Sequence, residues 1–381
     1  MDSYLRYARA KQKDIVALIR EFVECESPSD HPPGIARFVD LLTESVADIA
    51  KVKKFDGGHA RIEFTLPGPT KKEGQILALG HSDTVWTLGT LRTMPFRDQK
   101  GRLWGPGVLD MKAGLAFFIF AMRAIRELDA PVSKKIVLQV NADEEVGSDS
   151  SRALTEEAAR VSAAVLVLEP GTGLEGKLKT ARKGVGDYSI TVRGKASHAG
   201  VDFANGANAI VEMSRQLERI ASFTQLDRGV TVSPGVIHGG TRSNVVPAEC
   251  RAEIDIRCPR DRDRAYLEKK FASLKSFDKR CTLEITGGLN RPPMERSSGV
   301  RKLYRTAEKL AAELGVKLEE SSTGGGSDGN FTAALGIPTL DGLGSVGEGA
   351  HAPNESILIN RIADRTALLA KLICSLSPAS L

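Results

Sequence analysis

The chain has 381 residues, of which 41% are hydrophobic and 27% are charged, as is usual for a folded globular protein long enough to form two domains. Its 53 basic and 48 acidic residues are spread along the whole length, and no basic block interleaved with aromatic residues indicates a nucleic-acid-binding surface. The sequence also lacks a signal peptide, an apolar run near the ~18 residues of a membrane span, and any CxxC pair, so we expect a cytoplasmic protein with reduced thiols that binds neither nucleic acid nor membrane.

The first half of the chain alternates helical and strand patterns. Apolar residues recur at helical spacing over 15–22 and 35–49. Three later runs, 75–80, 135–140 and 163–168, are short and almost wholly apolar, as expected for buried, largely parallel strands, and an apolar-rich helix is predicted over 114–128. Strands separated by helices predict an α/β domain with a mostly parallel sheet.

The pattern changes near Lys183. Residues 187–194 alternate between apolar and polar, which is typical of a half-exposed antiparallel strand. The following patterns predict a helix over 208–222, strands over 230–238 and 248–257, a helix over 264–276 and a strand over 282–286. This β-α-β-β-α-β order predicts an inserted α+β, ferredoxin-like domain at 183–291. The first domain would then comprise 1–182 and 292–381, with later helices over 300–314 and 359–376 and a strand near Thr339.

Each of the three apolar runs ends in side chains that can bind a metal. They are His81 and Asp83 after the first run, Glu144 and Glu145 after the second, and Glu169 after the third. Because functional groups collect at the carboxyl ends of parallel strands, we expect these side chains to lie together. Two glycine-rich segments, which let the backbone approach a site closely, contribute Asp110 and His351.

The charge of these groups favours two cations over one. Imidazole and carboxylate ligands without thiolates suit zinc or a neighbouring divalent metal. If Asp110, Glu145 and Glu169 are ligands and Glu144 is a free base, four negative charges converge. We therefore expect two Zn²⁺ per subunit, with Co²⁺ or Mn²⁺ as alternatives, at a separation of ~3.5–4 Å.

The expected arrangement divides the ligands between the two cations. Asp110 would bridge them, His81 and Glu169 would hold one, and Glu145 and His351 would hold the other. Asp83, two residues beyond His81, would accept the other ring N–H of that histidine and so fix its tautomer.

Ordered motifs along nearly the whole chain resemble the co-catalytic metallopeptidase family of glutamate carboxypeptidase, aminoacylase, acetylornithine deacetylase and succinyl-diaminopimelate desuccinylase. The motifs are HSDTV (81–85), GPGVLDMKAG (105–114), DEE (143–145), KASHAG (195–200), GGGSDGNF (324–331) and GEGAHAP (347–353), together with the Glu169 position. The last two motifs are most similar to the glutamate carboxypeptidase-like branch. Glutamate at position 169 accompanies the carboxypeptidases and deacylases of this family, whereas aspartate accompanies aminopeptidase-like members.

The resemblance implies the roles of several residues. The five ligands would bind two zinc ions, Glu144 would be the general base, and the peptide between Asp110 and Met111 would be cis. His198 in KASHAG would stabilise the oxyanion from the partner subunit's inserted domain, so the enzyme would be a homodimer.

Three further positions are expected to bind the substrate. Asn244 and Arg291 match the family's carboxylate-binding asparagine and arginine, although Arg257 and Arg242 remain alternatives to Arg291. Gly325 lies in a turn that would present backbone donors to the substrate.

The function implied is zinc-dependent hydrolysis of an amide bond beside a free carboxylate, with release of a C-terminal amino acid. An N-acyl-amino-acid deacylase of the acetylornithine or succinyl-diaminopimelate type is the alternative within enzymes. A metal-binding pseudoenzyme is the alternative outside them, and the presence of Glu144 beside a complete ligand set argues against it.

Overall fold

The three apolar runs become neighbouring parallel strands in the computed structural model, which describes residues 2–377. β3 (Gln75–His81) lies between β6 (Lys135–Asn141) and β7 (Ser162–Val167), and β16 (Thr339–Leu340) follows beside β7. The hairpin of β1 (Ala50–Lys54) and β2 (Ala60–Phe64), which the sequence analysis did not predict, adds two strands, with β2 antiparallel to β6. The sheet is mixed and mostly parallel, so the predicted fold class is confirmed.

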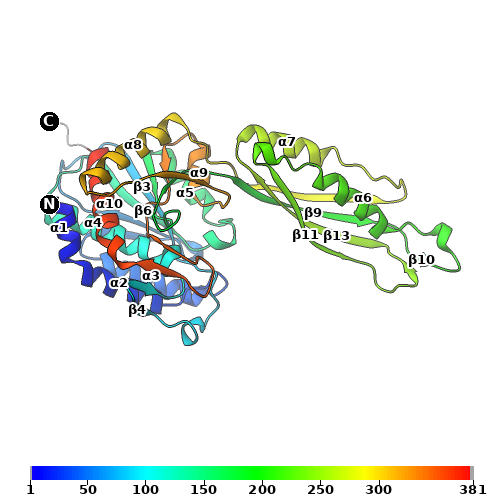
Figure 1. The fold of residues 1–381 in the computed structure, drawn as a ribbon, viewed down its shortest axis with the longest axis horizontal. Helices are drawn as coiled ribbons and strands as arrows, with labels where there is room; N and C mark the ends of the chain where they lie inside the picture. The colour runs from blue at the N-terminus through cyan, green and yellow to red at the C-terminus, as the bar shows by residue number, and fades with distance from the viewer. Residues whose placement is uncertain (1, 378–381) are drawn as a thin grey trace. The chain divides into compact units, whose positions relative to one another are not determined.

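Helices pack on both faces of this sheet because successive strand residues point to opposite sides (Figure 1). Ile76 and Ala78 join the larger core, which also contains residues of α4 and α10, whereas Leu77 and Leu79 pack in a smaller cluster with residues of α5. The helices of this part of the chain are α1 (Ser3–Ala10), α2 (Gln12–Glu24), α3 (Pro32–Val46), α4 (Ala113–Glu127), α5 (Arg152–Arg160), α8 (Ser298–Glu313), α9 (Gly329–Ala334) and α10 (Ile362–Leu376).

Two small sheets support loops outside the main sheet. One contains β4 (Arg97–Gln99), β5 (Arg102–Trp104), β17 (Gly347–Glu348) and β18 (Ser356–Leu358). The other pairs β8 (Leu178–Arg182) with β15 (Glu320–Thr323). Because β17 and β18 are antiparallel neighbours, the segment between them is held at both ends as a loop.

Residues 181–295 and 323–326 form a second compact unit with its own core. Its elements are β9 (Gly184–Arg193), β10 (Ser197–His198), α6 (Ala209–Ala221), β11 (Thr231–Gly239), β12 (Val245–Val246), β13 (Glu249–Cys258), α7 (Asp261–Ala272) and β14 (Thr282–Arg291). The antiparallel strand order β11-β13-β9-β14 is that of a ferredoxin-like sheet. Tyr188 stacks on Phe271 with ring centroids 3.7 Å apart, which fixes α7 against the sheet.

Two further findings concern the cysteines and the possibility of membrane-spanning helices. All five cysteines have free thiols. Within the described residues 2–377, every helix is too short or too polar to cross a bilayer.

Candidate metal centre

Five side chains from five segments meet at the carboxyl edge of the parallel strands. His81 is the last residue of β3, Glu145 lies in the short 3-10 turn Glu144–Val146 after β6, and Glu169 comes two residues after β7. Asp110 lies in the turn that precedes α4, and His351 lies in the loop between β17 and β18. The main sheet therefore positions three of the five groups directly.

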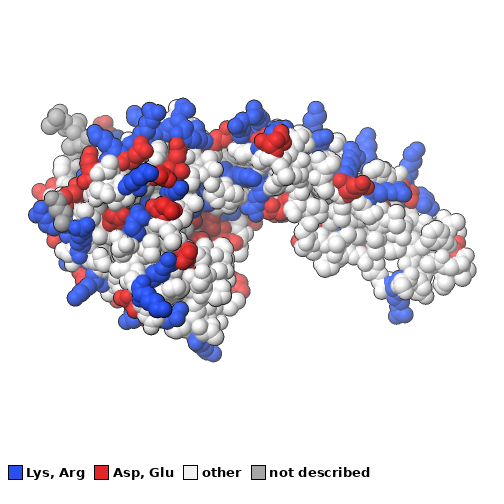
Figure 2. All heavy atoms as spheres, in the orientation of Figure 1, with Lys and Arg blue, Asp and Glu red and all other residues white. Residues whose placement is uncertain are grey.

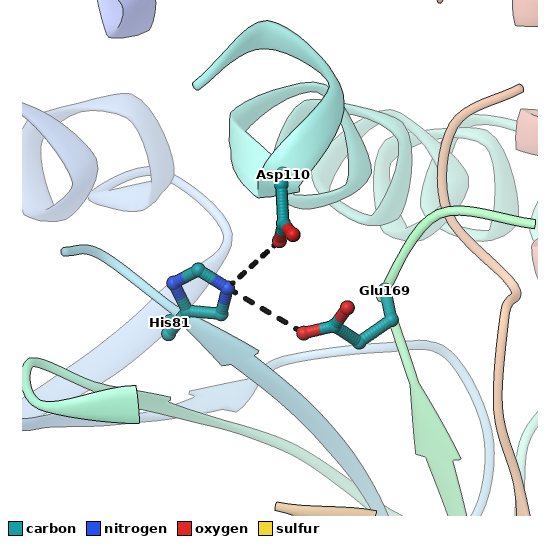
Figure 3. A group of neighbouring side chains, drawn as sticks. All are labelled: His81, Asp110 and Glu169. Atoms are coloured by element: carbon teal, nitrogen blue, oxygen red, sulfur yellow. Dashed lines mark hydrogen bonds and ion pairs between the residues drawn. The ribbon is translucent and has the colours of Figure 1, made fainter. Parts of the chain in front are cut away.

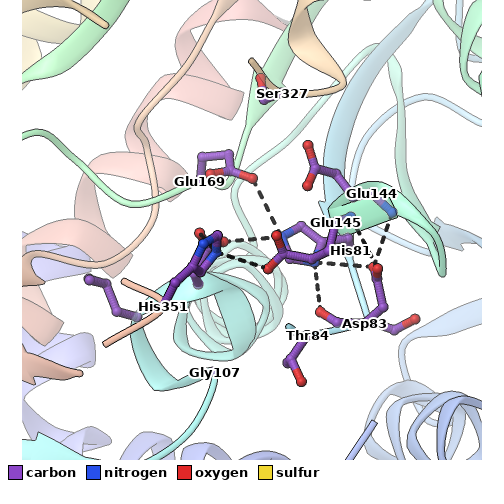
Figure 4. Close-up of polar contacts among 12 residues, drawn as sticks. His81, Asp83, Thr84, Gly107, Glu144, Glu145, Glu169, Ser327 and His351 are labelled. Carbon is purple, nitrogen blue, oxygen red and sulfur yellow. Dashed lines mark hydrogen bonds and ion pairs between the residues drawn. The ribbon is translucent and has the colours of Figure 1, made fainter. Parts of the chain in front are cut away.

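These side chains form two groups that share Asp110. In the first, His81 Nε2 lies 3.1 Å from Asp110 Oδ1 and 3.5 Å from Glu169 Oε1 (Figure 3). In the second, His351 Nε2 lies 3.6 Å from Asp110 Oδ2 and 3.3 Å from Glu145 Oε1. Figure 4 shows His351 and Glu145 together with the surrounding polar residues. In each group the candidate ligand atoms lie within 4.8 Å of one another. Asp110 thus directs one carboxylate oxygen to each group, as a bridging ligand does.

The electrostatics of both groups favour positive charge at the imidazole nitrogens. Although burial opposes the shift, hydrogen bonds to Asp110, Asp83 and Glu169 raise the pKa of His81 well above its usual value. Asp110 and Glu145 raise the pKa of His351 to about 10. The carboxylates would attract a divalent cation for the same reason.

The donors present fit a dinuclear metal site. Two imidazoles and three carboxylates are ligands suited to zinc and its neighbours. Glu145 Oε1 is buried and accepts no hydrogen bond from any described residue, although His351 is close. A buried carboxylate oxygen without a donor is unfavourable unless a cation binds it.

Asp83 supports both histidine and carboxylate ligands. His81 Nδ1 lies 2.9 Å from the main-chain oxygen of Asp83 and 3.4 Å from its carboxylate, so the backbone oxygen is the nearer acceptor. The two carboxylate oxygens accept the backbone N–H groups of Glu144 and Glu145 at 3.2 and 3.1 Å, and Ser29 Oγ donates at 2.8 Å. Asp83 therefore fixes the turn after β6 relative to the end of β3.

Glu355, a residue that the sequence analysis did not single out, supports the turn that contains Asp110. Its fully buried carboxylate accepts the backbone N–H groups of Gly107, Leu109 and Asp110 at 2.9, 2.8 and 3.2 Å, and the indole N–H of Trp86 at 2.7 Å. Burial raises the pKa of Glu355 to about 7, against the opposing effect of these donors. The Asp110–Met111 peptide in this turn is cis, as the resemblance implied.

His59, to which no sequence motif assigned a role, supports the segment after β6. Its Nδ1 accepts the N–H of Ala142 at 3.1 Å, so its Nε2 is the protonated nitrogen and donates to Ser150 Oγ at 3.0 Å. That hydroxyl donates to Asp143 Oδ2 at 2.7 Å. The network fixes Asp143, the residue directly before Glu144.

Glu144, the expected base, belongs to neither ligand group. Its backbone is anchored by Asp83, and its half-buried side chain projects from the same turn as Glu145 (Figure 4). A carboxylate beside the ligands, rather than among them, can accept a proton from a water bound there.

Two of the four predicted residues of the second unit lie next to each other. His198 in β10 pairs with Val245 in β12, and the N–H of Ala199 donates to the main-chain oxygen of Asn244 at 3.0 Å. The exposed His198 ring accepts the N–H groups of Gly200 and Val201 at Nδ1, at 3.1 and 3.2 Å. Its Nε2 is therefore protonated and can act as a donor.

The other two residues lie close together in the second unit, on either side of Gly326. Arg291 ends β14, and its buried side chain packs against the backbone of Gly326, next to Gly325. The Gly325 N–H donates to Thr323 Oγ1 at 3.3 Å, and its carbonyl accepts from Arg182. Arg257, one alternative to Arg291, forms a close ion pair with Asp255 at 2.7 Å.

The model of peptidase family M20/M25/M40 matches residues 77–375 of this chain. Among curated proteins, carboxypeptidase G2 of Pseudomonas sp. strain RS-16 is 29% identical over 378 residues, covering 97% of this chain and 91% of that protein. A succinyl-diaminopimelate desuccinylase of Cereibacter sphaeroides is 28% identical over 391 residues, covering 94% and 98%.

Solved structures show the same fold. The aminopeptidase PepT of Bacillus cereus superposes with a TM-score of 0.76 at 23% identity, covering 95% of this chain and 98% of that one. Identity at this level supports the shared architecture and leaves the substrate open.

Proposed function

The chain belongs to peptidase family M20/M25/M40, and from this premise we propose that it is a di-zinc hydrolase that cleaves an amide bond beside a free carboxylate and releases a C-terminal amino acid. The family assignment agrees with the resemblance in the motifs. The observation that carries the proposal is the pair of ligand groups joined through Asp110, with Glu144 on the adjacent turn.

Each residue around the cluster has a role in this reaction. Zinc held by the two groups would polarise the amide carbonyl and lower the pKa of a bound water. Glu144 accepts the proton of the attacking water and passes it to the leaving nitrogen. Asp83 and Glu355 hold the ligand-bearing turns in place through backbone N–H groups.

His198 is proposed to stabilise the oxyanion from a partner subunit. Its protonated Nε2 is the type of donor that this role needs. The proposed homodimer would form through the second unit, where β11 is an edge strand and Ile237 on it is 51% exposed. Ile210 and Val211 on α6 are also exposed, and together with Gly239 of β11 they line a groove of about 570 Å³.

Arg291 and Asn244 are proposed to bind the substrate carboxylate, and Gly325 to contribute a backbone contact. A guanidinium can hold a carboxylate through two parallel hydrogen bonds and so orient the scissile amide. Arg257, one of the alternatives, has its guanidinium engaged by the carboxylate of Asp255.

A deacylase is the second candidate because the chain is 28% identical to a succinyl-diaminopimelate desuccinylase, compared with 29% to carboxypeptidase G2. Both reactions cleave an amide next to a carboxylate. They differ in whether the acyl product or the amine product is the larger one. The same ligand set serves either, so the substrate panel must include both types.

The experiment is hydrolysis of N-acyl-glutamates, N-acetylornithine and N-succinyl-diaminopimelate by chelated protein before and after zinc is added. Zinc-dependent turnover that is fastest with an N-acyl-glutamate would support the carboxypeptidase. Preference for the other two substrates would support the deacylase, and no turnover by protein with two bound zinc ions would refute both. The E144Q variant controls for contaminating activity, since it retains all five ligands.

A further inference from the structure

The exposed face of α8 is strongly basic. Arg301, Lys302, Arg305 and Lys309 all project into solvent, and together with Leu310 they line a groove of about 590 Å³. Figure 2 shows this group of basic side chains over α8. Three of these cations, Arg301, Arg305 and Lys309, are spaced four residues apart and therefore form one ridge along the helix.

The cations of this face form no close ion pair with a carboxylate among the described residues, and Glu320, on which Arg305 acts at longer range, pairs with Arg296. Within residues 2–377, no ion pair joins any of the four cations to a carboxylate. Glu313, the acidic residue at the end of the groove, pairs with Lys371 at 3.0 Å instead. On α5, by contrast, Arg152 and Arg160 both pair with Glu156, which lies four residues from each of them.

Like charges at four-residue spacing destabilise a helix by a few tenths of a kcal/mol per pair, so an anion bound along the ridge would relieve this repulsion. The helical rise places successive cations of the ridge about 6 Å apart and the whole ridge over about 12 Å. A ligand that neutralises all of them must be elongated and carry several negative charges.

The lining of the groove restricts the kind of anion. Of the described residues that line it, none is aromatic and Leu310 alone is a large apolar residue. Single-stranded nucleic acids are bound by stacking on aromatic side chains, and membranes and helical peptides need an apolar face. Guanidinium groups in a mostly polar groove suit phosphate oxygens.

We propose that the ridge formed by Arg301, Arg305 and Lys309 is a binding site for a linear phosphoanion, separate from the metal centre. The site recognises consecutive phosphate groups and nothing apolar. It does not depend on the hydrolase function, because no residue of the groove belongs to the metal centre.

The test is calorimetric titration of the zinc-loaded protein with sodium tripolyphosphate. The R301Q/R305Q/K309Q variant removes the ridge, and R260Q/R262Q/K269Q removes three equally exposed cations from α7 or its start, so that both variants lose the same charge. Any competition of the phosphoanion for zinc affects all three proteins equally. Thermal unfolding shows whether each variant is folded.

We expect one tripolyphosphate per subunit, with Kd raised by at least about tenfold in the ridge variant and unchanged in the α7 variant. Added salt should weaken binding to the wild-type protein, because salt screens the attraction between the cations and the phosphates, and it should weaken binding less in the ridge variant. Equal loss in both variants, binding unaffected by the ridge variant, or no binding would overturn the proposal. Tighter binding of a single-stranded oligonucleotide than of tripolyphosphate would also overturn it.

Discussion

Replacement of Glu355 by alanine should destabilise the turn that holds Asp110. The carboxylate of Glu355 is fully buried and accepts three backbone N–H groups, from Gly107, Leu109 and Asp110. An alanine provides no acceptor at this position, and the residue lies too far inside the protein for bulk water to replace the carboxylate.

The cost follows from the number of donors left without a partner. A buried donor that loses its acceptor costs about 1–3 kcal/mol, so the three backbone donors cost about 3–9 kcal/mol, and the indole N–H of the half-buried Trp86 loses its acceptor as well. Removal of a buried carboxylate offsets part of this, since its burial is itself unfavourable, as its raised pKa shows. We therefore expect the free energy of unfolding to fall by about 3 kcal/mol, near the lower limit.

The assay is urea denaturation of chelated E355A and wild-type protein, with zinc stoichiometry measured in parallel. E348A is the control, because Glu348 lies in the same segment and forms a partly exposed ion pair with Arg102, whose loss should cost about 1 kcal/mol. E355A should also bind less zinc, because Asp110 contributes to both ligand groups. Equal destabilisation by the two variants would refute the reasoning.

Three other outcomes are expected. E144Q should keep both metals while kcat falls by about 10²–10⁴-fold, and loss of metal with the activity would instead make Glu144 a ligand. H59L should lower the free energy of unfolding by about 1–3 kcal/mol because the Ala142 N–H loses its acceptor, while H59Q, which keeps an acceptor and a donor, should restore most of it in urea denaturation. Hydrogen bonding from Arg280 holds the pKa of Asp278 at about 2, so its stabilising effect should be present above about pH 4 and lost as the pH falls through 2. NMR titration of labelled aspartate should show that pKa return toward its usual value in R280Q, and an unchanged pKa would contradict the assigned cause.

Three central strands of the main sheet could be predicted from the sequence to within one or two residues. The apolar runs 75–80, 135–140 and 163–168 correspond to β3, β6 and β7, since a strand buried on both faces needs an unbroken apolar run. The hairpin of β1 and β2 was missed because its first strand, AKVKK, is mostly charged and is placed by pairing with β2 rather than by its own pattern.

The candidate ligands could be singled out for a related reason. His81, Glu145 and Glu169 follow buried strands directly, so the sheet geometry brings them together whatever the loops do. Glu355 and His59 carried no such signal. Their importance comes from backbone N–H groups of distant segments, and such contacts exist only once the loops are folded.

The supporting residues explain how the acidic cluster is held in place. Asp83 and Glu355 are buried carboxylates outside both ligand groups, and each accepts backbone N–H groups from a turn that carries a ligand. These hydrogen bonds fix the Glu145 and Asp110 turns independently of any cation, so little conformational entropy remains to be lost when metal binds. The same carboxylates add negative charge near the ligands, which further favours divalent cations. Asp83 and Glu355 therefore both hold the ligand-bearing turns in place and attract the cations. Replacing either residue by a neutral one should weaken both effects.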